Sequence, residues 1–352
     1  MPYKELITTV ITTYKRPLLL KRAVNSVLQQ TYPHFQISVY DNNSDDGTEE
    51  LMQEFARQDK RVKYHRHPTN IGMMANYEYA FANIKTPYFS MLSDDDYLMP
   101  CFFETAIKSF EEYPKAAFVA CGVGQNDGKD IVWDPLSAWK REGCYEAPDG
   151  VLEMLSSYNT LPLPTGILFQ SKSVKDITPD WSEVVQLRWD SDYLLQISAQ
   201  YPCVINKKLC AIFSLHENSF TGAFFSEMKN AVKLHDKYLK ASERMLNRLI
   251  ANPSVSDDSK IVIKEKFLKM LRNETSYHMY RYIVMKNNVA AIELMKIFQD
   301  YYPIDKKQKL LGLLARLNNT VLFQPVIGSC FLILRTLIHF YRRVKDINVR
   351  RR

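Results

Sequence analysis

Apolar and polar residues alternate along the N-terminal third of the chain in a pattern that predicts strands and helices in turn. β-Branched and apolar residues fill positions 6 to 11, and apolar residues then recur at helical spacing between Pro17 and Leu28. Alternation at positions 35 to 39 predicts a second strand, which ends at Asp41. The chain therefore begins with a strand, a helix and a second strand.

The same succession continues further along the chain. Strands are predicted at 62–65, 88–92 and 117–121, and helices at 51–55, 76–84 and 102–110. Repeated β-α units imply a parallel sheet with helices on both faces, and ligands of such folds collect at the carboxyl ends of the strands. Two polar clusters, DNNSDDGT and SDDD, directly follow predicted strands. We therefore expect the functional site at this edge of the sheet.

The pattern changes in the rest of the chain. A loop-rich stretch follows, and strands resume at 167–169 and 209–215 around a helical segment. From there to the end the sequence predicts helices, without an internal repeat. We therefore predict an α/β domain at 1–225, a helical region at 226–319 and an amphipathic basic segment at 320–352.

Three adjacent carboxylates, Asp94, Asp95 and Asp96, stand immediately after an apolar strand. Neighbouring carboxylates repel one another, so such a cluster is unfavourable unless a cation or hydrogen-bond donors compensate it. Mg²⁺ and Mn²⁺ prefer oxygen ligands and commonly combine one or two carboxylates with phosphate oxygens of a substrate. The cluster thus predicts a divalent-metal site, with a solvated turn that caps the next helix as the alternative.

Another acidic residue, Asp41, ends a predicted strand and precedes a polar turn. A carboxylate at a buried strand end can accept a hydrogen bond from an imide or amino group of a nucleobase. Asp, Ser and Gly near the start of a helix also form turns and caps. Capping is as plausible as binding for Ser44 to Thr48, whereas it explains Asp41 less well.

Four polar segments occur in order at the ends of predicted strands. They are Thr13-Tyr14-Lys15-Arg16-Pro17, Asp41-Asn42-Asn43-Ser44-Asp45-Asp46-Gly47-Thr48, Asn70-x-Gly72-x-x-x-Asn76, and Ser93-Asp94-Asp95-Asp96 followed by Pro100. Together they resemble glycosyltransferase family 2 of the GT-A fold, over about residues 5 to 220. The resemblance implies an α/β fold with a Rossmann-like, mainly parallel sheet, a nucleotide-sugar donor, a divalent metal (Mn or Mg) and inversion at the anomeric carbon.

The resemblance also implies roles for individual residues. Thr13 and Tyr14 would hold the nucleobase together with Asp41, Asp94 or Asp95 would lie by the ribose, and Asp96 would bind the metal on the diphosphate. The implied donor-binding set is Thr13, Tyr14, Arg16, Asp41, Asn70, Asn76, Asp94 and Asp95. His216 is a second metal candidate, with contact to the diphosphate or a structural role at a strand end as alternatives.

Two later segments are similar to the family's acidic-aromatic segment and its downstream histidine element. They are Trp189-Asp190-Ser191-Asp192-Tyr193-Leu194-Leu195 and Phe213-Ser214-Leu215-His216-Glu217-Asn218-Ser219. The family often has Glu-Asp where this chain has Ser191-Asp192, so the catalytic base is Asp192, our first choice, or Asp190. Inversion by a single displacement needs one base to take the proton of the acceptor hydroxyl. Retention would need a nucleophile as well.

All four tryptophans fall in one stretch of the chain. They are Trp133, Trp139, Trp181 and Trp189. Aromatic faces suit the apolar side of sugar rings, so we expect one or more of them to line the acceptor site. The alternative is that they fill the core of a loop-rich subdomain.

Charge is distributed unevenly along the chain. Of the 352 residues 46 are basic and 39 acidic, a net charge of +7, but residues 335–352 alone hold seven basic residues and one acidic residue. Residues 1–334 therefore carry only +1, which argues against nucleic acid as a partner. The apolar stretch at 321–341 contains Arg335 and so fits a helix on an anionic membrane surface better than a span. Packing on the body or on a second copy, as a homo-oligomer, is the alternative.

Two further features indicate a cytoplasmic protein. The six cysteines include no C-x-x-C pair and are too sparse to form a disulfide framework. Threonines interrupt the apolar residues near the N-terminus, which therefore predicts a strand rather than a signal peptide. We expect a cytoplasmic enzyme that is peripheral at the inner face of the membrane.

These observations predict an inverting, metal-dependent glycosyltransferase that adds a sugar to a glycan or lipid-linked acceptor. Family members that it resembles act in the assembly of bacterial O-antigen, capsule and other surface polysaccharides. A nucleotidyltransferase, which would release pyrophosphate, is the first alternative, and a catalytically inactive nucleotide-sugar-binding or scaffold protein is the second. Neither G-x-G-x-x-G nor G-x-x-x-x-G-K-[ST] occurs, which argues against dehydrogenase and P-loop functions.

Overall fold

A computed structural model describes residues 6–126, 134–156, 160–186, 188–214, 216 and 231–318. Contacts divide the chain into two compact units, Met1–Ala231 with Lys240–Phe267, and Val232–Leu239 with Leu268–Arg352. The boundary predicted near residue 225 lies outside the described residues. Part of the predicted helical region, residues 240–267, groups with the α/β unit.

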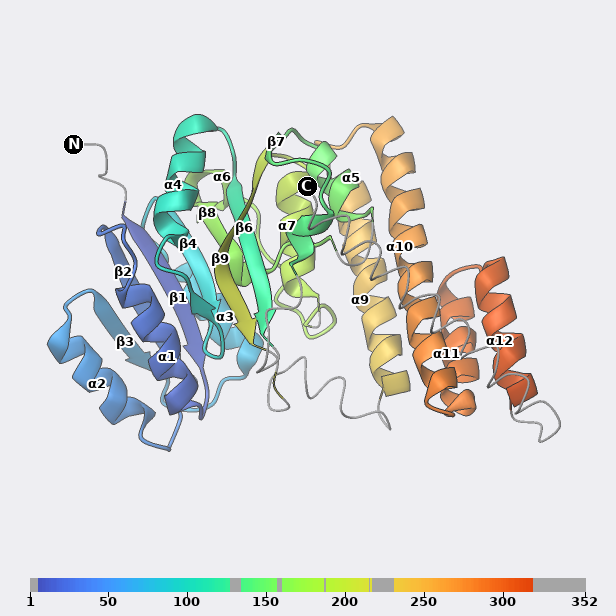
Figure 1. The fold of residues 1–352 in the computed structure, drawn as a ribbon, viewed down its shortest axis with the longest axis horizontal. Helices are drawn as coiled ribbons and strands as arrows, with labels where there is room; N and C mark the ends of the chain where they lie inside the picture. The colour runs from blue at the N-terminus through green and yellow to red at the C-terminus, as the bar shows by residue number, and fades with distance from the viewer. Residues whose placement is uncertain are drawn as a thin grey trace, which may run out of the picture. The chain divides into compact units, whose positions relative to one another are not determined.

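The first unit is built on one mixed sheet, shown in Figure 1, which confirms the α/β fold class. Its strands are β1 (Ile7–Thr13), β2 (Phe35–Asp41), β3 (Val62–Arg66), β4 (Tyr88–Ser93), β5 (Tyr97–Leu98), β6 (Phe118–Asn126), β7 (Gly143–Tyr145), β8 (Ile167–Gln170) and β9 (Cys203–Ser214). Their order is β3-β2-β1-β4-β8-β6-β9-β5, with β7 paired to β9. The central position of β1 places its neighbours β2 and β4 on either side of it.

Strand direction changes across the sheet. Strands β3, β2, β1 and β4 are parallel, because consecutive β-α-β crossovers connect them. Beyond β4 the sheet is mixed, since β8 runs antiparallel to both β4 and β6 while β9 is parallel to β6. All pairs among β3, β2, β1 and β4 are thus parallel, as the sequence predicts, whereas the rest of the sheet combines parallel and antiparallel pairs.

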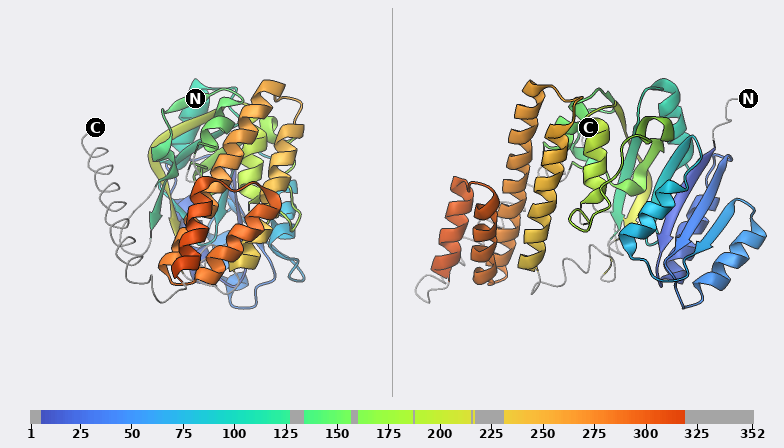
Figure 2. Two further views of the ribbon diagram at one scale, coloured as in Figure 1. Left: turned by 90° about the vertical axis from the view of Figure 1, so that its right-hand side faces the viewer. Right: turned by 180° about the vertical axis from the view of Figure 1, so that it is seen from behind.

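Helices cover both faces of this sheet. They are α1 (Pro17–Leu28), α2 (Thr48–Gln58), α3 (Met73–Ala82), α4 (Phe102–Glu112), α5 (Asp149–Met154), α6 (Ser171–Val174) and α7 (Trp189–Ser198), with short 3₁₀ turns at Pro135–Ala138 and Pro164–Gly166. Successive residues of a strand point to opposite faces. Ile11 therefore belongs to the core formed with α1, whereas Val10 packs with Ala80 of α3. Figures 1 and 2 show α1 and α3 on opposite sides of the sheet.

The second unit consists of helices. It comprises α11 (Asn288–Tyr301), α12 (Lys306–Asn318) and parts of the long helices α9 (Ala231–Ala251) and α10 (Asp257–Val284). The Asn287 side chain caps α11 by accepting a hydrogen bond from the Ala290 amide at 3.2 Å. Gly312 allows α12 to approach Met295 closely, because a Cβ atom there would collide with the Met295 side chain. Among the helices described for this chain, none is long and apolar enough to cross a membrane.

A matched pair of leucines on α1 tests the assigned core. Leu20 is 0% exposed, whereas Leu18 on the same helix is 82% exposed. We expect Leu20→Ala to lower the free energy of unfolding by about 2–5 kcal/mol through lost burial and a residual cavity. Leu18→Ala should change it by no more than about 0.5 kcal/mol. Denaturant unfolding of both variants provides the measurement, and similar losses for the two would contradict this packing of α1.

Candidate functional site

The parallel strands bring three polar segments to one edge of the sheet. Thr13 at the end of β1 pairs in register with Asp41 at the end of β2. On the other side of β1, Thr12 pairs with Ser93, the last residue of β4. The segments that follow these strands therefore converge, although Thr13 and Asp94 are 81 residues apart in sequence. Such convergence is expected of parallel β-α units.

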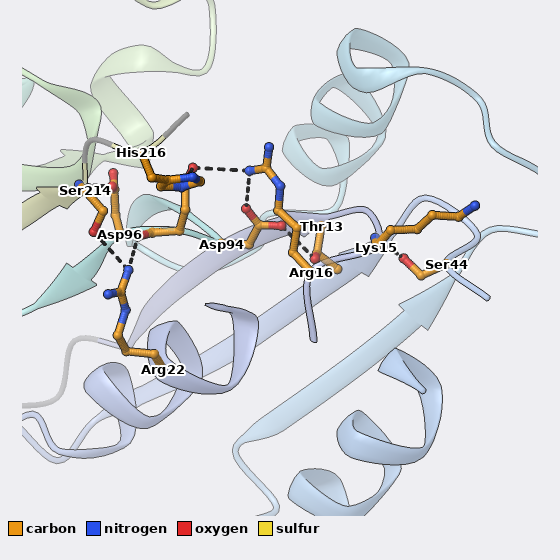
Figure 3. Close-up of polar contacts among 10 residues, drawn as sticks. Thr13, Lys15, Arg16, Arg22, Ser44, Asp94, Asp96, Ser214 and His216 are labelled. Carbon is orange, nitrogen blue, oxygen red and sulfur yellow. Dashed lines mark hydrogen bonds and ion pairs between the residues drawn. The ribbon is translucent and has the colours of Figure 1, made fainter. Parts of the chain in front are cut away.

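One arginine compensates two of the clustered carboxylates. Arg16 Nη1 lies 3.1 Å from Asp94 Oδ1 and 3.2 Å from Asp95 Oδ2. Figure 3 shows the Arg16 side chain directed toward Asp94. The Thr13 hydroxyl donates to the other oxygen of Asp94 at 2.8 Å. Burial raises the pKa of Asp94 to about 6, and the Arg16 charge opposes that rise. The acidic cluster is therefore a partly desolvated group that a cation stabilises, rather than a solvated turn.

The third aspartate, Asp96, faces inward. Its side chain accepts hydrogen bonds from the Thr165 hydroxyl and from the Ser214 amide, the latter at 2.9 Å. Asp96 is 0% exposed, and burial together with the charge of Asp95 raises the pKa of Asp96 to about 7. Each carboxylate oxygen thus accepts one hydrogen bond and keeps lone pairs for a cation. The role of Asp96 as metal ligand, expected from the resemblance, stays a prediction.

His216 approaches the cluster from the segment after β9. Its Nε2 atom lies 3.1 Å from Asp95 Oδ2. Arg22 holds the same region from α1, where its Nη2 donates to the Asp95 carbonyl oxygen and, at 2.9 Å, to the Ser214 hydroxyl. Figure 3 shows Arg22 and Arg16 on either side of the carboxylates. The structure therefore joins His216 to Asp95, whereas Ser214 of the same element contacts Asp96.

The donor set fits a hard divalent cation. Asp95 offers a carboxylate and His216 an imidazole at adjoining positions, and an Arg16 cation already lies against the carboxylates. Within the described part of the chain there is no cluster of three or more His, Cys, Asp or Glu side chains arranged to hold a metal. The Asp95 carboxylate agrees with the way Mg²⁺ is usually bound, with substrate phosphates and water as the remaining ligands, whereas an imidazole ligand is more typical of transition metals.

Asp41 is buried at the end of β2. One carboxylate oxygen accepts from the Ser44 amide at 2.9 Å and the other accepts from the Tyr64 hydroxyl at 2.7 Å. The Ser44 hydroxyl in turn accepts from the Lys15 amide at 2.7 Å. Burial, with Asp41 as a second cause, raises the pKa of Tyr64. Asp41 thus ties the loop after β1 to the loop after β2, and a nucleobase would have to share or displace these partners.

Tyr14 and Asn70 lie together beside this loop. Tyr14 is exposed, and hydrogen bonding to Asn70, followed by Lys15, lowers the pKa of its phenol. Asn70 Oδ1 accepts from the Asn42 side chain and from the Gly72 amide, both at 2.9 Å. An exposed ring anchored by a fixed amide is suited to contact a flat heterocycle.

Asn76 has a structural role instead. Its side-chain amide donates to the Tyr40 carbonyl at 3.1 Å, and its oxygen lies 3.0 Å from His67 Nε2. The residue is buried. These partners fix α3 to β2, so the geometry does not support the donor-binding role that the resemblance implied for Asn76.

An aromatic cluster connects the carboxyl edge of the parallel strands to α7. The ring of Tyr77 lies 5.0 Å from that of Trp189, and Trp189 lies 5.4 Å from Trp181. Hydrogen bonds from Thr12 and Ser93 lower the pKa of Tyr77, but burial outweighs them and raises it to about 12. Tyr77 therefore joins the ends of β1 and β4 to the start of α7.

The other two tryptophans stand apart from this cluster. Trp139 is almost completely buried, and its indole N–H donates to the Thr160 carbonyl at 2.7 Å. Such a ring fills the core, so the geometry removes Trp139 from the acceptor candidates. Trp133 lies outside the described residues.

The two base candidates occupy different environments. Asp190 lies in the first turn of α7, where its side chain accepts from the Ser191 amide at 2.7 Å, and burial raises its pKa. Asp192 is completely buried and paired with Arg248, and the Gln196 side chain donates to it at 3.2 Å. A general base needs a carboxylate oxygen within reach of substrate. Asp190 is partly exposed, whereas Asp192, our first choice from the sequence, is completely buried, and the identity of the base stays a prediction.

Arginine contacts hold α7 against α9 and the segment before α7. Arg248 also donates to the Thr178 carbonyl at 2.9 Å, and Arg244 pairs with Asp180. Arg188, the residue directly before α7, donates to the Ser242 hydroxyl of α9 at 2.7 Å. Residues 240–251 of α9 thus position the helix that begins with Trp189 and Asp190.

Comparison with known proteins identifies the architecture. The sequence model of Glycosyl transferase family 2 matches residues 8–167, which include the ends of β1, β2 and β4. Residues 8–167 of the α/β unit therefore match glycosyltransferase family 2. This finding agrees with the resemblance of the four polar segments.

Individual relatives support the same assignment. The GalNAc(5)-diNAcBac-PP-undecaprenol beta-1,3-glucosyltransferase of Campylobacter jejuni is 26% identical over 116 residues, which are 33% of this chain and 38% of that protein. Three other curated relatives, each named as a glycosyltransferase, are matched over 15%, 38% and 39% of their own lengths. The chain thus matches well under half of each of these relatives.

Solved structures show the fold. The crystal structure of S. aureus TarS 1-349 in complex with UDP-GlcNAc is similar with a TM-score of 0.61 at 14% identity, covering 87% of this chain and 83% of that chain. Mannosyltransferase PcManGT from Pyrobaculum calidifontis, in complex with GDP-Man and Mn2+, gives a TM-score of 0.55 at 11% identity over 96% of this chain and 87% of that chain. The α/β unit therefore has the GT-A fold.

Several residues of the site had no sequence signal. They are Arg22, Tyr64, Tyr77, Thr165 and Arg248. Each is an ordinary helix, strand or loop residue whose partner lies far away in sequence, so no local motif marks it. Only Tyr77 follows a recognised segment directly, and its position next to Asn76 could have indicated proximity to the strand ends.

Substitution of the two α7 carboxylates separates their structural roles. Asp192→Asn should lower the free energy of unfolding by about 1–3 kcal/mol, because it leaves the Arg248 charge without its partner. Partial exposure of Arg248 limits the loss. Asp190→Asn should cost less than about 1 kcal/mol, since an amide oxygen can still accept from Ser191. Denaturant unfolding is the measurement, and equal losses would contradict the anchoring role of Asp192.

Proposed function

We propose that this protein is a glycosyltransferase that moves a sugar from a nucleoside-diphosphate sugar to a hydroxyl group of a glycan or lipid-linked acceptor. The observation that carries the proposal is the group formed by Arg16, Asp94, Asp95 and His216 at the carboxyl edge of the parallel strands. A desolvated acidic group with a cation and an imidazole at that edge suits a metal-bound diphosphate. The match of residues 8–167 to the family 2 model supports the same activity.

The nucleoside part of the donor would lie over the loops after β1 and β2. We propose Tyr14 and Asn70 as contacts of the base and Asp41 as an acceptor from it, while Thr13 fixes the Asp94 carboxylate for the ribose. Because Asp41 already has two hydrogen-bond donors, its carboxylate is held in one orientation before the ligand arrives. Such preorganisation lowers the entropy cost of binding.

Asp95 and His216 would hold a divalent cation, rather than Asp96, the ligand that the family resemblance implied. When bound, Mg²⁺ or Mn²⁺ supplies positive charge that stabilises the departing diphosphate. Arg16 and Arg22 add fixed positive charge beside the same carboxylates. Thr165 and Ser214 hold Asp96, which braces the loop that carries Asp95.

Transfer with inversion requires one base, and we propose Asp190 for it. Its carboxylate would take the proton of the acceptor hydroxyl as the oxygen forms a bond to the anomeric carbon. The bond from that carbon to the diphosphate oxygen breaks in the same step, and its electron pair leaves with the nucleoside diphosphate. The raised pKa of Asp190 makes it a stronger proton acceptor than an ordinary aspartate.

The acceptor would lie against the aromatic cluster beside Asp190. Trp189, Trp181 and Tyr77 offer ring faces between the donor edge and the start of α7. The relative from C. jejuni carries a name that describes transfer to a polyprenyl-linked oligosaccharide. We propose an acceptor of this class, in surface-polysaccharide assembly, with the basic segment at 320–352, outside the described residues, as a membrane contact.

Transfer and base function are tested together. Incubation with nucleotide sugars, Mn²⁺ or Mg²⁺ and a lipid-linked oligosaccharide should release nucleoside diphosphate, whereas release of pyrophosphate would indicate a nucleotidyltransferase. Asp190→Asn should lower the turnover rate by about 10²–10⁴-fold and leave donor affinity unchanged, because the base acts on the acceptor. Asp192→Asn is the matched control, and a greater loss of turnover in this control would overturn the choice of Asp190.

Metal binding distinguishes Asp95 from Asp96. We expect Asp95→Asn to abolish the increase in melting temperature that Mn²⁺ produces together with a nucleoside diphosphate, since a ligand that binds only the folded state raises that temperature. Asp96→Asn should keep this increase while lowering the melting temperature of the free protein. The reverse pattern would restore Asp96 as the metal ligand.

A further inference from the structure

The positive charge of the chain begins within the folded helical unit. Residues 306–352 contain eleven basic residues and one acidic residue, a net charge of +10. Residues 1–305 contain 35 basic and 38 acidic residues, a net charge of −3. The change of sign therefore falls at the start of α12, which contributes four basic residues and no acidic residue.

The buried residues of α12 lie along one side of the helix. They are Gln308, Leu311, Gly312 and Ala315, spaced as one helical face. Gly312 sets this face against Met295 of α11. The opposite face must therefore point away from α11.

That outer face combines leucines with basic side chains. Leu310 is 56% exposed and Leu313 is 51% exposed. The surrounding exposed positions of the helix are Lys306, Lys307, Lys309 and Arg316. A helix packed on a protein core usually presents polar residues to water, so leucines in the middle of the exposed face need another explanation.

We infer that the outer face of α12 is a docking surface for an anionic lipid bilayer. Leucine side chains can enter the boundary between headgroups and acyl chains, while the flexible stems of lysine and arginine let their charges reach lipid phosphates. Each basic residue near an anionic surface adds favourable binding energy. Contact between copies of this chain is the competing occupant, because the centres of protein interfaces are also apolar.

Other parts of the same chain support a lipid bilayer as the occupant. Exposed apolar side chains also occur at the junction of α10 and α11, where they are Val284, Met285 and Val289. The sequence after α12 continues into the apolar stretch at 321–341 and its basic end. In sequence, α12 is thus followed by a segment that is also apolar and basic. The inference does not depend on the proposed glycosyl transfer.

Vesicle binding by the full chain tests the inference. We expect cosedimentation with vesicles of phosphatidylglycerol and phosphatidylcholine, and little with phosphatidylcholine alone. Leu310→Gln with Leu313→Gln should weaken binding to the anionic vesicles by roughly tenfold or more. Lys306→Gln with Lys309→Gln should do the same and reduce the dependence on salt.

A matched control uses exposed apolar residues of α10. Ile261 is 62% exposed and Val262 is also exposed, so Ile261→Gln with Val262→Gln makes the same chemical change elsewhere. This control should bind vesicles as the unchanged protein does, and melting curves confirm that every variant is folded. Unchanged binding by the α12 leucine variant would overturn the inference. A change only in the mass of the protein in solution would also overturn it, by assigning α12 to contact between copies.

Discussion

The parallel pairing of β1 with β2 and β4 is the constraint on which the site depends. In register, Thr13 meets Asp41 on one side and Thr12 meets Ser93 on the other. Because β-α-β crossovers make all these strands run in the same direction, their following loops leave the sheet at one edge. Most polar groups proposed to contact the donor come from these strand ends, the loops after them or a helix that begins there, whereas Asn70 follows β3 and His216 follows β9.

Concentrating acidic residues at that edge creates an electrostatic cost that the surrounding structure offsets. Arg16 lies between Asp94 and Asp95, and the Thr165 hydroxyl and Ser214 amide satisfy Asp96. The three adjacent aspartates therefore have different environments. Asp96 is held inside the protein by Thr165 and Ser214, whereas Asp95 contacts Arg16 and His216.

A second fixed element is the start of α7. The Arg248–Asp192 pair and the Arg188 contact to Ser242 hold this helix against residues 240–251 of α9. The paired charges are buried on the Asp192 side, so loss of either partner would leave a costly unpaired charge. The helical region therefore supports the proposed base rather than serving only as an appendage.

The sequence by itself determined the fold class, the strand-helix succession and the edge at which polar residues gather. Hydrophobic periodicity and strand-end motifs are local properties, so they were visible without coordinates. It could not assign roles among neighbours such as Asp95 and Asp96 or Asp190 and Asp192, because residues one or two apart look alike in a motif. Tertiary structure gives these neighbours different surroundings through partners distant in sequence, Thr165 and His216 for the first pair and Arg248 for the second. It also showed that Trp139 and Asn76 are buried, since burial depends on how whole elements pack.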